Sequence, residues 1–398
     1  MSSANGPLPA RGERVPQAGE GPRHEPGTAP SSACGTFSPD VRGRRTKELL
    51  AAARGERVHV EGEELVRAAA SEGLLGLLAR AATNPHRDLQ IKGAAIEAHG
   101  AFMSAELARI AAAFEWAGLP FLAFKGPVLS QQLYGDPGLR SFSDLDVITA
   151  PRAADAAEAL LRGLGYRELE PLGDSERKTN RRFAGELLFT NDSNGVLLDF
   201  HTHFANQQFP VRLSFDDVWR RRAEVAIGAM RIPSFGESDL VILTCNHAAK
   251  HLWHKLEFFA QIAALARKQI DWSEVDRMAV DARAARQVGL SFLLARDLLG
   301  VEPPPVTRCL ALATPHLDRV KQIVGRAQDA TGRDLFLLLD RRRDALRAIA
   351  LSVFVPTRDD WRESSIPWLY RPYRLLRRSL KRAAPDSRCE PGGTTAGC

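Results

Sequence analysis

Two aspartates at the start of an apolar run constrain this chain more than any other feature of its sequence. The run from Leu145 to Thr149 is typical of a β-strand, and Asp144 and Asp146 stand at its head. Because side chains alternate between the two faces of a strand, residues two apart point the same way. Neighbouring carboxylates repel each other unless a cation lies between them or one of them binds a proton. The pattern therefore predicts a cation site, and Mg²⁺ suits it because this ion prefers carboxylate and phosphate oxygens.

A third carboxylate lies in another apolar run. Asp199 belongs to the segment from Val196 to His201, which we expect to form a hairpin with Glu186 to Thr190 and to lie beside the first strand. Three carboxylates that hold two metal ions can stabilise the attacking and leaving oxygens of an in-line displacement. The predicted metal ligands and catalytic residues are therefore Asp144, Asp146 and Asp199.

Phosphate-binding groups precede the acidic pair. Lys125 and Gly126 stand between a predicted strand, Phe121 to Phe124, and a predicted helix, Pro127 to Tyr134. The backbone N–H groups at the N-terminus of a helix favour phosphate. Arg140 lies in the loop just before Asp144, where a guanidinium is suited to a pair of phosphate oxygens.

The surrounding sequence divides into regions of different character. Residues 1–44 are rich in Pro, Gly, Ser and Arg without apolar periodicity, and 383–398 are similar, so both tails are predicted to be disordered. Helical periodicity fills 45–118 and 236–382. Between them, 119–235 alternates short apolar runs with turns, and Ala223 to Ile232 adds one more strand. The predicted fold class is α+β, a mixed sheet flanked by N-terminal and C-terminal helical regions.

Composition narrows the class of protein. Hydrophobic residues make up 44% of the 398 residues and charged residues 26%, as in an average soluble domain. No apolar stretch is long enough to span a membrane, and the first thirty residues lack the apolar centre of a secretory signal peptide. The five cysteines form no CxxC pair, which favours a reducing compartment. We therefore expect a cytoplasmic protein.

The net charge of +6 raises the question of an anionic partner. Most basic runs lack the interleaved aromatic residues of a base-stacking platform, so nucleic acid is not the expected partner. The segment Pro367 to Arg382 differs, because an apolar stripe faces its arginines: Trp368, Leu369, Tyr373, Leu376 and Leu380. Such a segment either lies on an anionic membrane surface or docks on its own domain through the arginine stems.

Histidines suggest an alternative. The segment Asp199 to His203 contains His201 and His203, a pattern with which metal-dependent hydrolases begin their metal site. A hydrolase barrel needs repeated strand–helix units after that point, whereas the sequence beyond residue 235 is helical. In the main hypothesis, His201 hydrogen-bonds a metal-bound carboxylate. His247 and His251, one helical turn apart, pack beneath the site or contact substrate.

The order of these motifs resembles the polymerase-β-like nucleotidyltransferase superfamily. It is most similar to an uncharacterised bacterial nucleotidyltransferase family that carries Lys-Gly, then Leu-Tyr, an arginine, an Asp-x-Asp strand and a later strand ending in His. The resemblance runs from about Leu49 to Arg382. It includes the segment with Trp253 and the ending Arg371 to Leu376.

The resemblance implies a reaction and roles for the site residues. Asp144 and Asp146 would hold Mg²⁺, with Asp199 as third carboxylate and candidate general base. Lys125, Gly126 and Arg140 would bind the triphosphate, and His201, His247 and His251 the substrate. The implied reaction moves a nucleoside monophosphate from a Mg²⁺-bound nucleoside triphosphate to a small-molecule, peptide or protein acceptor. A noncatalytic nucleotide-binding or scaffold protein of the same fold is the alternative.

Overall fold

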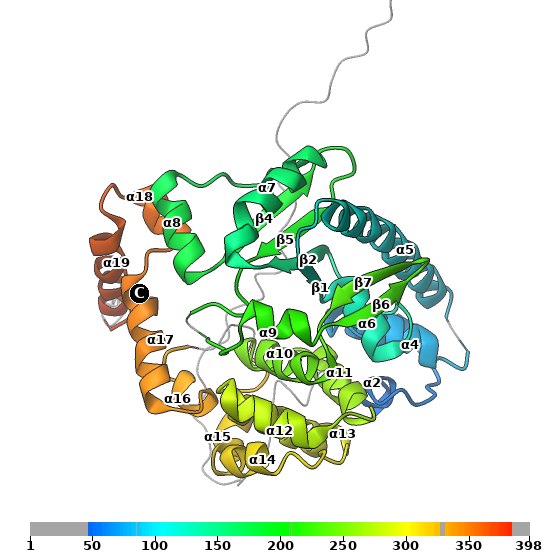
Figure 1. Cartoon of the computed structure of the whole chain (residues 1–398). Coiled ribbons are helices and arrows are strands. Elements are labelled where there is room, and N and C mark those ends of the chain that lie inside the picture. Colours follow the sequence, from blue (N-terminus) through cyan, green and yellow to red (C-terminus); the bar gives the residue numbers. More distant parts are fainter. Residues whose placement is uncertain (1–46, 85, 208, 327–330, 384–398) are drawn as a thin grey trace, which may run out of the picture. The chain divides into compact units, whose positions relative to one another are not determined.

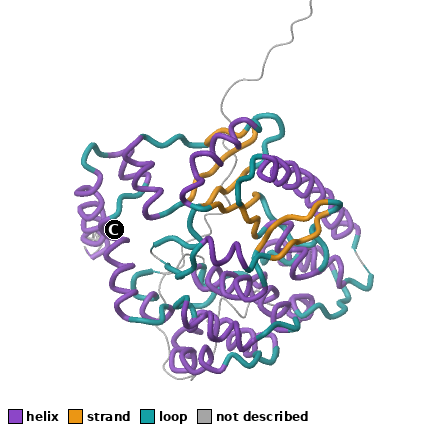
Figure 2. Tube along the Cα trace, viewed as in Figure 1, coloured by secondary structure: helices purple, strands orange, loops and turns teal. Residues whose placement is uncertain are grey.

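A mixed sheet carries the acidic residues. The computed structural model describes residues 47–84, 86–207, 209–326 and 331–383, so the predicted disordered segments lie outside the described residues except for 383. Within these ranges, five strands form a sheet in the order β1-β2-β5-β4-β3, with β2 and β5 parallel and the other neighbours antiparallel (Figures 1 and 2). Its strands are β1 (Phe121–Phe124), β2 (Asp144–Thr149), β3 (Tyr166–Glu168), β4 (Glu186–Asn191) and β5 (Leu197–His201). The sheet and the helices on both sides of it in sequence confirm the predicted α+β class.

One face of the sheet is apolar and covered by helices. Because side chains alternate between the two faces of a strand, Leu145 and Val147 of β2 and Leu198 and Phe200 of β5 point into one buried cluster. Helix α5 (Arg87–Trp116), thirty residues long, contributes apolar residues three or four apart, and α7 (Ala154–Gly163) adds a second layer: Met103, Leu107, Ile110, Phe114, Ala157 and Leu161. The opposite face is left for Asp144, Asp146 and Asp199.

Short N-terminal helices precede α5. They are α2 (Lys47–Ala53), α3 (Gly62–Ser71) and α4 (Leu75–Ala81). They share a second hydrophobic cluster with C-terminal helices, and α2 contacts α11 (Leu256–Ala266). Helix α5 ends at Trp116, followed by Gly118 with a positive φ of 63°, as the Gly118–Pro120 stop predicts.

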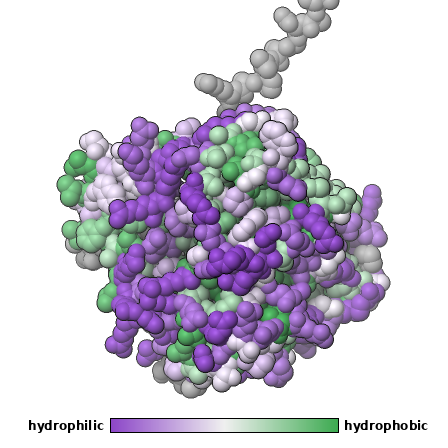
Figure 3. All heavy atoms as spheres, viewed as in Figure 1, coloured by the Kyte–Doolittle hydropathy of each residue, from purple (hydrophilic) through white to green (hydrophobic). Residues whose placement is uncertain are grey.

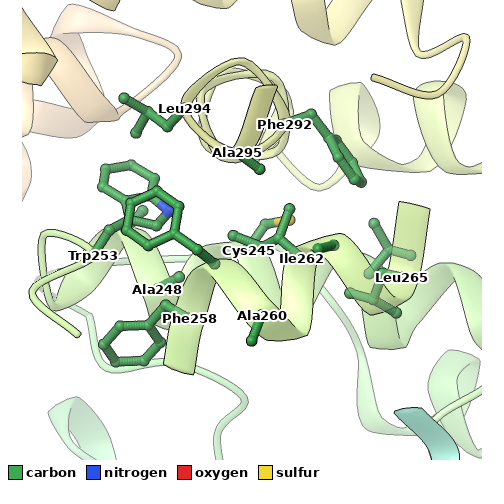
Figure 4. Packing of buried hydrophobic residues seen from close by; sticks show 14 of the residues in the cluster. Cys245, Ala248, Trp253, Phe258, Ala260, Ile262, Leu265, Phe292, Leu294 and Ala295 are labelled. Carbon is green, nitrogen blue, oxygen red and sulfur yellow. The ribbon is translucent and has the colours of Figure 1, made fainter. Parts of the chain in front are cut away.

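The second cluster is centred on the C-terminal helices. In Figure 4, residues of α13 (Ala285–Leu299), such as Phe292 and Ala295, face Cys245 of α10 (Glu237–Lys250) and Ile262 of α11. Trp253 is fully buried there and donates its indole N–H to Ser291 Oγ at 3.1 Å. The further helices are α12 (Trp272–Asp281), α14 (Thr307–Ala313), α15 (Leu317–Lys321), α16 (Leu335–Leu338), α17 (Arg342–Phe354), α18 (Arg358–Glu363) and α19 (Pro367–Ala383), with 3₁₀ turns η1 (Pro151–Ala153) and η2 (Thr314–His316). None of the described helices is long and apolar enough to cross a membrane.

Several elements differ from the prediction. The segment from 223 forms two strands rather than one, β6 (Ala223–Ile227) and β7 (Met230–Ser234), which pair as a separate hairpin. Strand β3 and the helices α8 (Asp174–Phe183) and α9 (Phe215–Arg220) were not predicted. Strand β3 has three residues, too few for a periodic pattern. Helix α8 is polar except for Phe183, and it is held by ion pairs such as Arg177 with Glu158 at 2.9 Å.

The two hydrophobic clusters cross the predicted region boundaries. The sheet cluster combines residues of 45–118 with residues of 119–235, and the second cluster includes residues from all three regions between the tails. The division at 118 and 235 stays a prediction about sequence character. Physically, the N-terminal helices complete the cores of both neighbouring regions.

Candidate functional site

Parallel pairing of β2 with β5 brings two predicted carboxylates together. Asp146 lies directly opposite Asp199 in the register of these strands. Asp144 precedes Asp146 by two residues and therefore points from the same face. Phe124 of β1 is the antiparallel neighbour of Asp146 on the other side. The sheet face that carries the acidic residues is thus bordered by an aromatic ring.

A group able to hold a metal ion forms on this face. Asp146, Asp199 and His201 each offer one ligand atom within 4.8 Å of the others. His201 Nε2 is buried without a hydrogen-bond partner among the described residues and lies 3.4 Å from Asp146 Oδ1. An unpartnered nitrogen beside two carboxylates fits a cation ligand set. Two of the three predicted ligands belong to this group, while Asp144 lies outside it and its role stays a prediction.

Lys125 supplies a positive charge beside Asp146. Its Nζ lies 2.6 Å from Asp146 Oδ1, a contact between a half-buried ammonium and a buried carboxylate. The residue has a positive φ of 57°, unusual for a side chain larger than glycine, and Gly126 follows with a φ of 44°. This tight turn ends β1 and begins α6 (Gly126–Tyr134), with Pro127 in its first turn. Lys125 and the N-terminus of α6 therefore lie beside the carboxylates, as predicted for a phosphate site.

The carboxylates and Lys125 shift one another's pKa values. Burial disfavours the charged form of Lys125, but Asp146, Asp144 and Asp199 outweigh it and raise its pKa. Burial likewise opposes ionisation of Asp146, yet Lys125 and His201 lower its pKa. Burial and then Asp146 raise the pKa of Asp144, and the same two causes raise the pKa of Asp199 to about 7. Lys125 therefore favours the ionised form of Asp146, while the raised pKa values of Asp144 and Asp199 favour their protonated forms.

A cavity of about 270 Å³ opens on this face. It is lined by the predicted site residues Lys125, Asp199, His201, His247 and His251. An aromatic wall completes it: the rings of Phe124 and Phe235 stack at 5.2 Å, and Phe204 meets Phe235 edge-on at 5.7 Å. A cavity lined by both aromatic rings and charged groups suits a nucleotide.

The end of α10 holds two histidines against the cavity. The rings of His247 and His251 lie 4.6 Å apart, and His251 stacks on Phe258 at 6.0 Å. Burial, followed by the charge of Lys125, lowers the pKa of His247 well below the usual range, so this ring is neutral at pH 7. Leu252 and Trp253 then take positive φ values, which turn the chain sharply after the helix. Both predicted histidines thus reach the cavity, and their contact with substrate stays a prediction.

Arg140 has a different partner from the one predicted. Its Nε donates to Glu257 Oε1 at 3.1 Å, and both side chains are largely buried. Arg140 is not among the described residues that line the cavity. The sequence gives no indication of this ion pair, because its partners are 117 residues apart. The proposed contact of Arg140 with a triphosphate stays a prediction.

Several cavity residues were missed. Phe204 and Phe235 have no motif around them and reach the cavity through the fold alone. Lys250 lines the cavity as well. Its position three residues after His247 places it on the same helix face, so helical spacing could have found it.

The hydrolase alternative is not supported by the site. The metal-binding group of the described residues contains His201 but neither His203 nor a later histidine. His203 Nδ1 instead lies 3.2 Å from Thr202 Oγ1. The described chain after 235 is helical, without the repeated strand–helix units of a barrel.

Comparison with known proteins gives a family match. A family model described as an uncharacterised nucleotidyltransferase matches residues 58–300, which confirms the resemblance seen in the sequence. No curated protein matches the chain.

Solved structures are similar at low sequence identity. The antibiotic-resistance factor ANT(2'')-Ia is 15% identical over 45% of this chain and 90% of that chain, with a TM-score of 0.33. The nucleotidyltransferase toxin MenT4 of Mycobacterium tuberculosis H37Rv is 14% identical over 64% and 94%, with a TM-score of 0.31. An antigenic nucleotidyltransferase-like protein of Paracoccidioides brasiliensis is 11% identical over 50% and 93%, with a TM-score of 0.29. Superpositions of this quality carry no argument about the activity of the chain.

Proposed function

The chain belongs to the uncharacterised nucleotidyltransferase family, and from this premise we propose that it transfers a nucleoside monophosphate from a Mg²⁺-bound nucleoside triphosphate to an acceptor. One observation carries the proposal. Asp146 and Asp199 lie opposite each other on parallel strands, with the Lys125 ammonium 2.6 Å from Asp146 at the head of a helix. Asp199 and Lys125 line one cavity, and Asp146 contacts that ammonium, so acidic groups for a cation adjoin a basic group for phosphate.

The proposed roles follow from position and charge. Asp144, Asp146 and Asp199 would hold Mg²⁺, which when bound supplies positive charge beside the phosphate oxygens. The backbone N–H groups at the start of α6 and the Lys125 ammonium would bind the triphosphate. The aromatic wall of Phe124 and Phe235 would hold the base by stacking.

The proposed chemistry is an in-line displacement at the α-phosphorus. A nucleophilic oxygen of the acceptor forms a bond to this phosphorus while the bond to the pyrophosphate oxygen breaks. Asp199, whose pKa is raised to about 7 by burial and by Asp146, would take the proton of the acceptor oxygen. Pyrophosphate leaves with its charge balanced by Lys125 and Lys250, which both line the cavity.

A second cavity is the proposed acceptor site. It also measures about 270 Å³, and Ala184, Glu186 and Asn206 line it together with the first cavity. It extends from β3 and β4 of the sheet to α8, α17 and α18. Glu186 is the register neighbour of His201, so the two cavities adjoin on the Asp199 side of the site. An acceptor bound there would present its oxygen to the proposed base.

The first test is calorimetric titration with ATP, CTP, GTP and UTP in the presence and absence of Mg²⁺. We expect Mg²⁺-dependent binding of at least one nucleotide, abolished in the folded double variant Asp144→Asn/Asp146→Asn. The control double variant Asp192→Asn/Asp318→Asn changes the same chemistry at exposed positions, 60% and 67% accessible at the side chain, and should bind as the wild type does.

Three outcomes are informative. Nucleotide binding lost only in the site variant supports the proposal. Absence of binding by folded wild type contradicts it. Tight, Mg²⁺-dependent binding without pyrophosphate release across a panel of acceptors would favour the noncatalytic alternative.

A further inference from the structure

The last described helix presents an apolar stripe to the outside. Ile366, directly before α19, and Leu369, Tyr373 and Leu376 within it are here called the outer stripe; the three helical residues are spaced four and three apart, so they share one side of α19. Their exposed fractions are 59%, 69%, 56% and 60%. In Figure 3, hydrophobic residues gather at the left edge of the molecule, where Figure 1 places α19. The stripe is therefore left uncovered by the described residues.

The opposite side of α19 is held to the protein by arginines. Arg374 is 7% exposed, and its Nε lies 2.9 Å from the fully buried Asp360 of α18. Arg371 donates to the backbone carbonyl of Ser352 on α17 at 3.0 Å. Trp368 meets Phe183 of α8 edge-on at 6.2 Å. The helix thus docks on its own chain through its arginines, which is one of the two alternatives predicted.

This orientation reverses the usual arrangement of a surface helix. A surface helix ordinarily buries its apolar stripe and exposes its charges. Here Asp360 neutralises the inward arginines, and the charged pairs are withdrawn from water while large apolar side chains are exposed. A contiguous exposed apolar surface of this kind marks a contact site.

Charge identifies the partner. Between 364 and 383 the chain contains no Asp or Glu, and in addition to the inward-facing Arg371 and Arg374 it contains the basic residues Arg377, Arg378, Lys381 and Arg382. Arg377 is exposed and follows Leu376 directly. Leucine, isoleucine and tyrosine beside basic residues are the composition of helices that lie in the interface of an anionic bilayer. We propose that the outer stripe of α19 binds an anionic membrane surface, with the helix axis parallel to that surface.

Residues 384–398 lack the large apolar side chains that could cover the stripe, since their sequence contains no Val, Ile, Leu, Met, Phe, Trp or Tyr. A second copy of the chain would bring another basic α19 against the first, which like-charge repulsion opposes. An anionic lipid surface satisfies both the apolar and the basic character of the helix.

The test is flotation of the full chain with vesicles. Vesicles of phosphatidylcholine with about 30 mol% phosphatidylglycerol, which gives the membrane a negative surface potential, are compared with vesicles of phosphatidylcholine alone. We expect binding to the anionic vesicles that weakens with added salt. Leu369→Ser/Leu376→Ser should reduce the partition coefficient about tenfold or more, because each leucine contributes apolar burial. Arg377→Gln should reduce it several-fold on anionic vesicles only.

The matched control changes an exposed apolar pair elsewhere. Ile91 and Phe102 on α5 are 59% and 46% exposed, and Ile91→Ser/Phe102→Ser should float as the wild type does. Equal loss of binding in both serine variants would overturn the assignment to α19, as would equal binding to neutral and anionic vesicles. Failure to float, or a dimer in light scattering that the Leu369→Ser/Leu376→Ser variant dissolves, would also overturn it. These readouts are independent of nucleotide binding.

Discussion

Substitution of Asp199 tests the electrostatics of the site without any substrate. Burial and the neighbouring Asp146 raise the pKa of Asp199 from 3.8 to about 7. At 1.36 kcal/mol per unit, this rise of about 3 units corresponds to about 4 kcal/mol, which we halve to about 2 kcal/mol because solvent screens the partly exposed carboxylate. The folded protein binds this proton more tightly than the unfolded chain does. The stability contribution is therefore full below about pH 4, falls as the pH rises towards 7 and is absent above it.

Asp199→Asn imitates the protonated carboxyl at every pH. In metal-free buffer we expect the variant to be more stable than the wild type, and the difference in free energy of unfolding to grow by about 1 to 2 kcal/mol between pH 5 and pH 8.5. Urea denaturation at the two pH values measures this difference. The exposed Asp318→Asn is the control and should show no such growth. A difference that does not change with pH would refute the reasoning, since Asp199 would then ionise as an ordinary carboxylate.

Further predictions concern the metal, the packing and the last helices. Because Mg²⁺ needs ionised carboxylates, its binding should release roughly one proton at pH 6.5 and almost none at pH 8.5. Calorimetry in two buffers of different ionisation enthalpy measures the number of protons released. Proton release that does not depend on pH would contradict the assignment of Asp199 as a ligand. Gly76→Ala should lower the free energy of unfolding in urea by about 1 to 3 kcal/mol, because the added Cβ would lie 1.9 Å from the carbonyl oxygen of Leu139. A variant as stable as the wild type would contradict this close contact. Asp360→Asn removes the nearest and, among the described residues, the only fully buried of the charged partners of Arg374, Asp359 and Glu363 being exposed, and should cost about 3 kcal/mol. The loss should be visible as faster hydrogen exchange in α18 and α19, whereas unchanged exchange would contradict the anchoring role of Asp360.

Local patterns predicted the elements that carry the site. The strands β1, β2 and β5 have clear apolar alternation, and the helix after Gly126 has a proline in its first turn, so their positions follow from propensity and spacing. The two aspartates on one strand face follow from alternation alone. That Asp199 belongs beside them was predicted from chain order and resemblance, and the parallel register of β2 with β5 provides the geometric reason.

The remainder depends on contacts between distant residues. Helix α8 is polar, and its ion pairs with α7 and β3 become visible only when these elements are placed together. Phe235 reaches the cavity from the end of β7, more than a hundred residues after Phe124. Arg140 is a second example. Its position in the loop before Asp144 predicted a phosphate contact, whereas in the fold it pairs with the distant Glu257.

The contact between Lys125 and Asp146 couples the two ligands of the proposed site. One ammonium serves as counter-ion of the carboxylate while the site holds no cation, and the same ammonium is the proposed phosphate group. A cation on Asp146 therefore competes with Lys125 and releases it, and the released charge is then available to a triphosphate. Nucleotide and metal ion should consequently raise each other's affinity by the same factor, as thermodynamic reciprocity requires. Either ligand alone must displace an internal salt bridge and should bind weakly, so the site discriminates in favour of the nucleotide–metal pair.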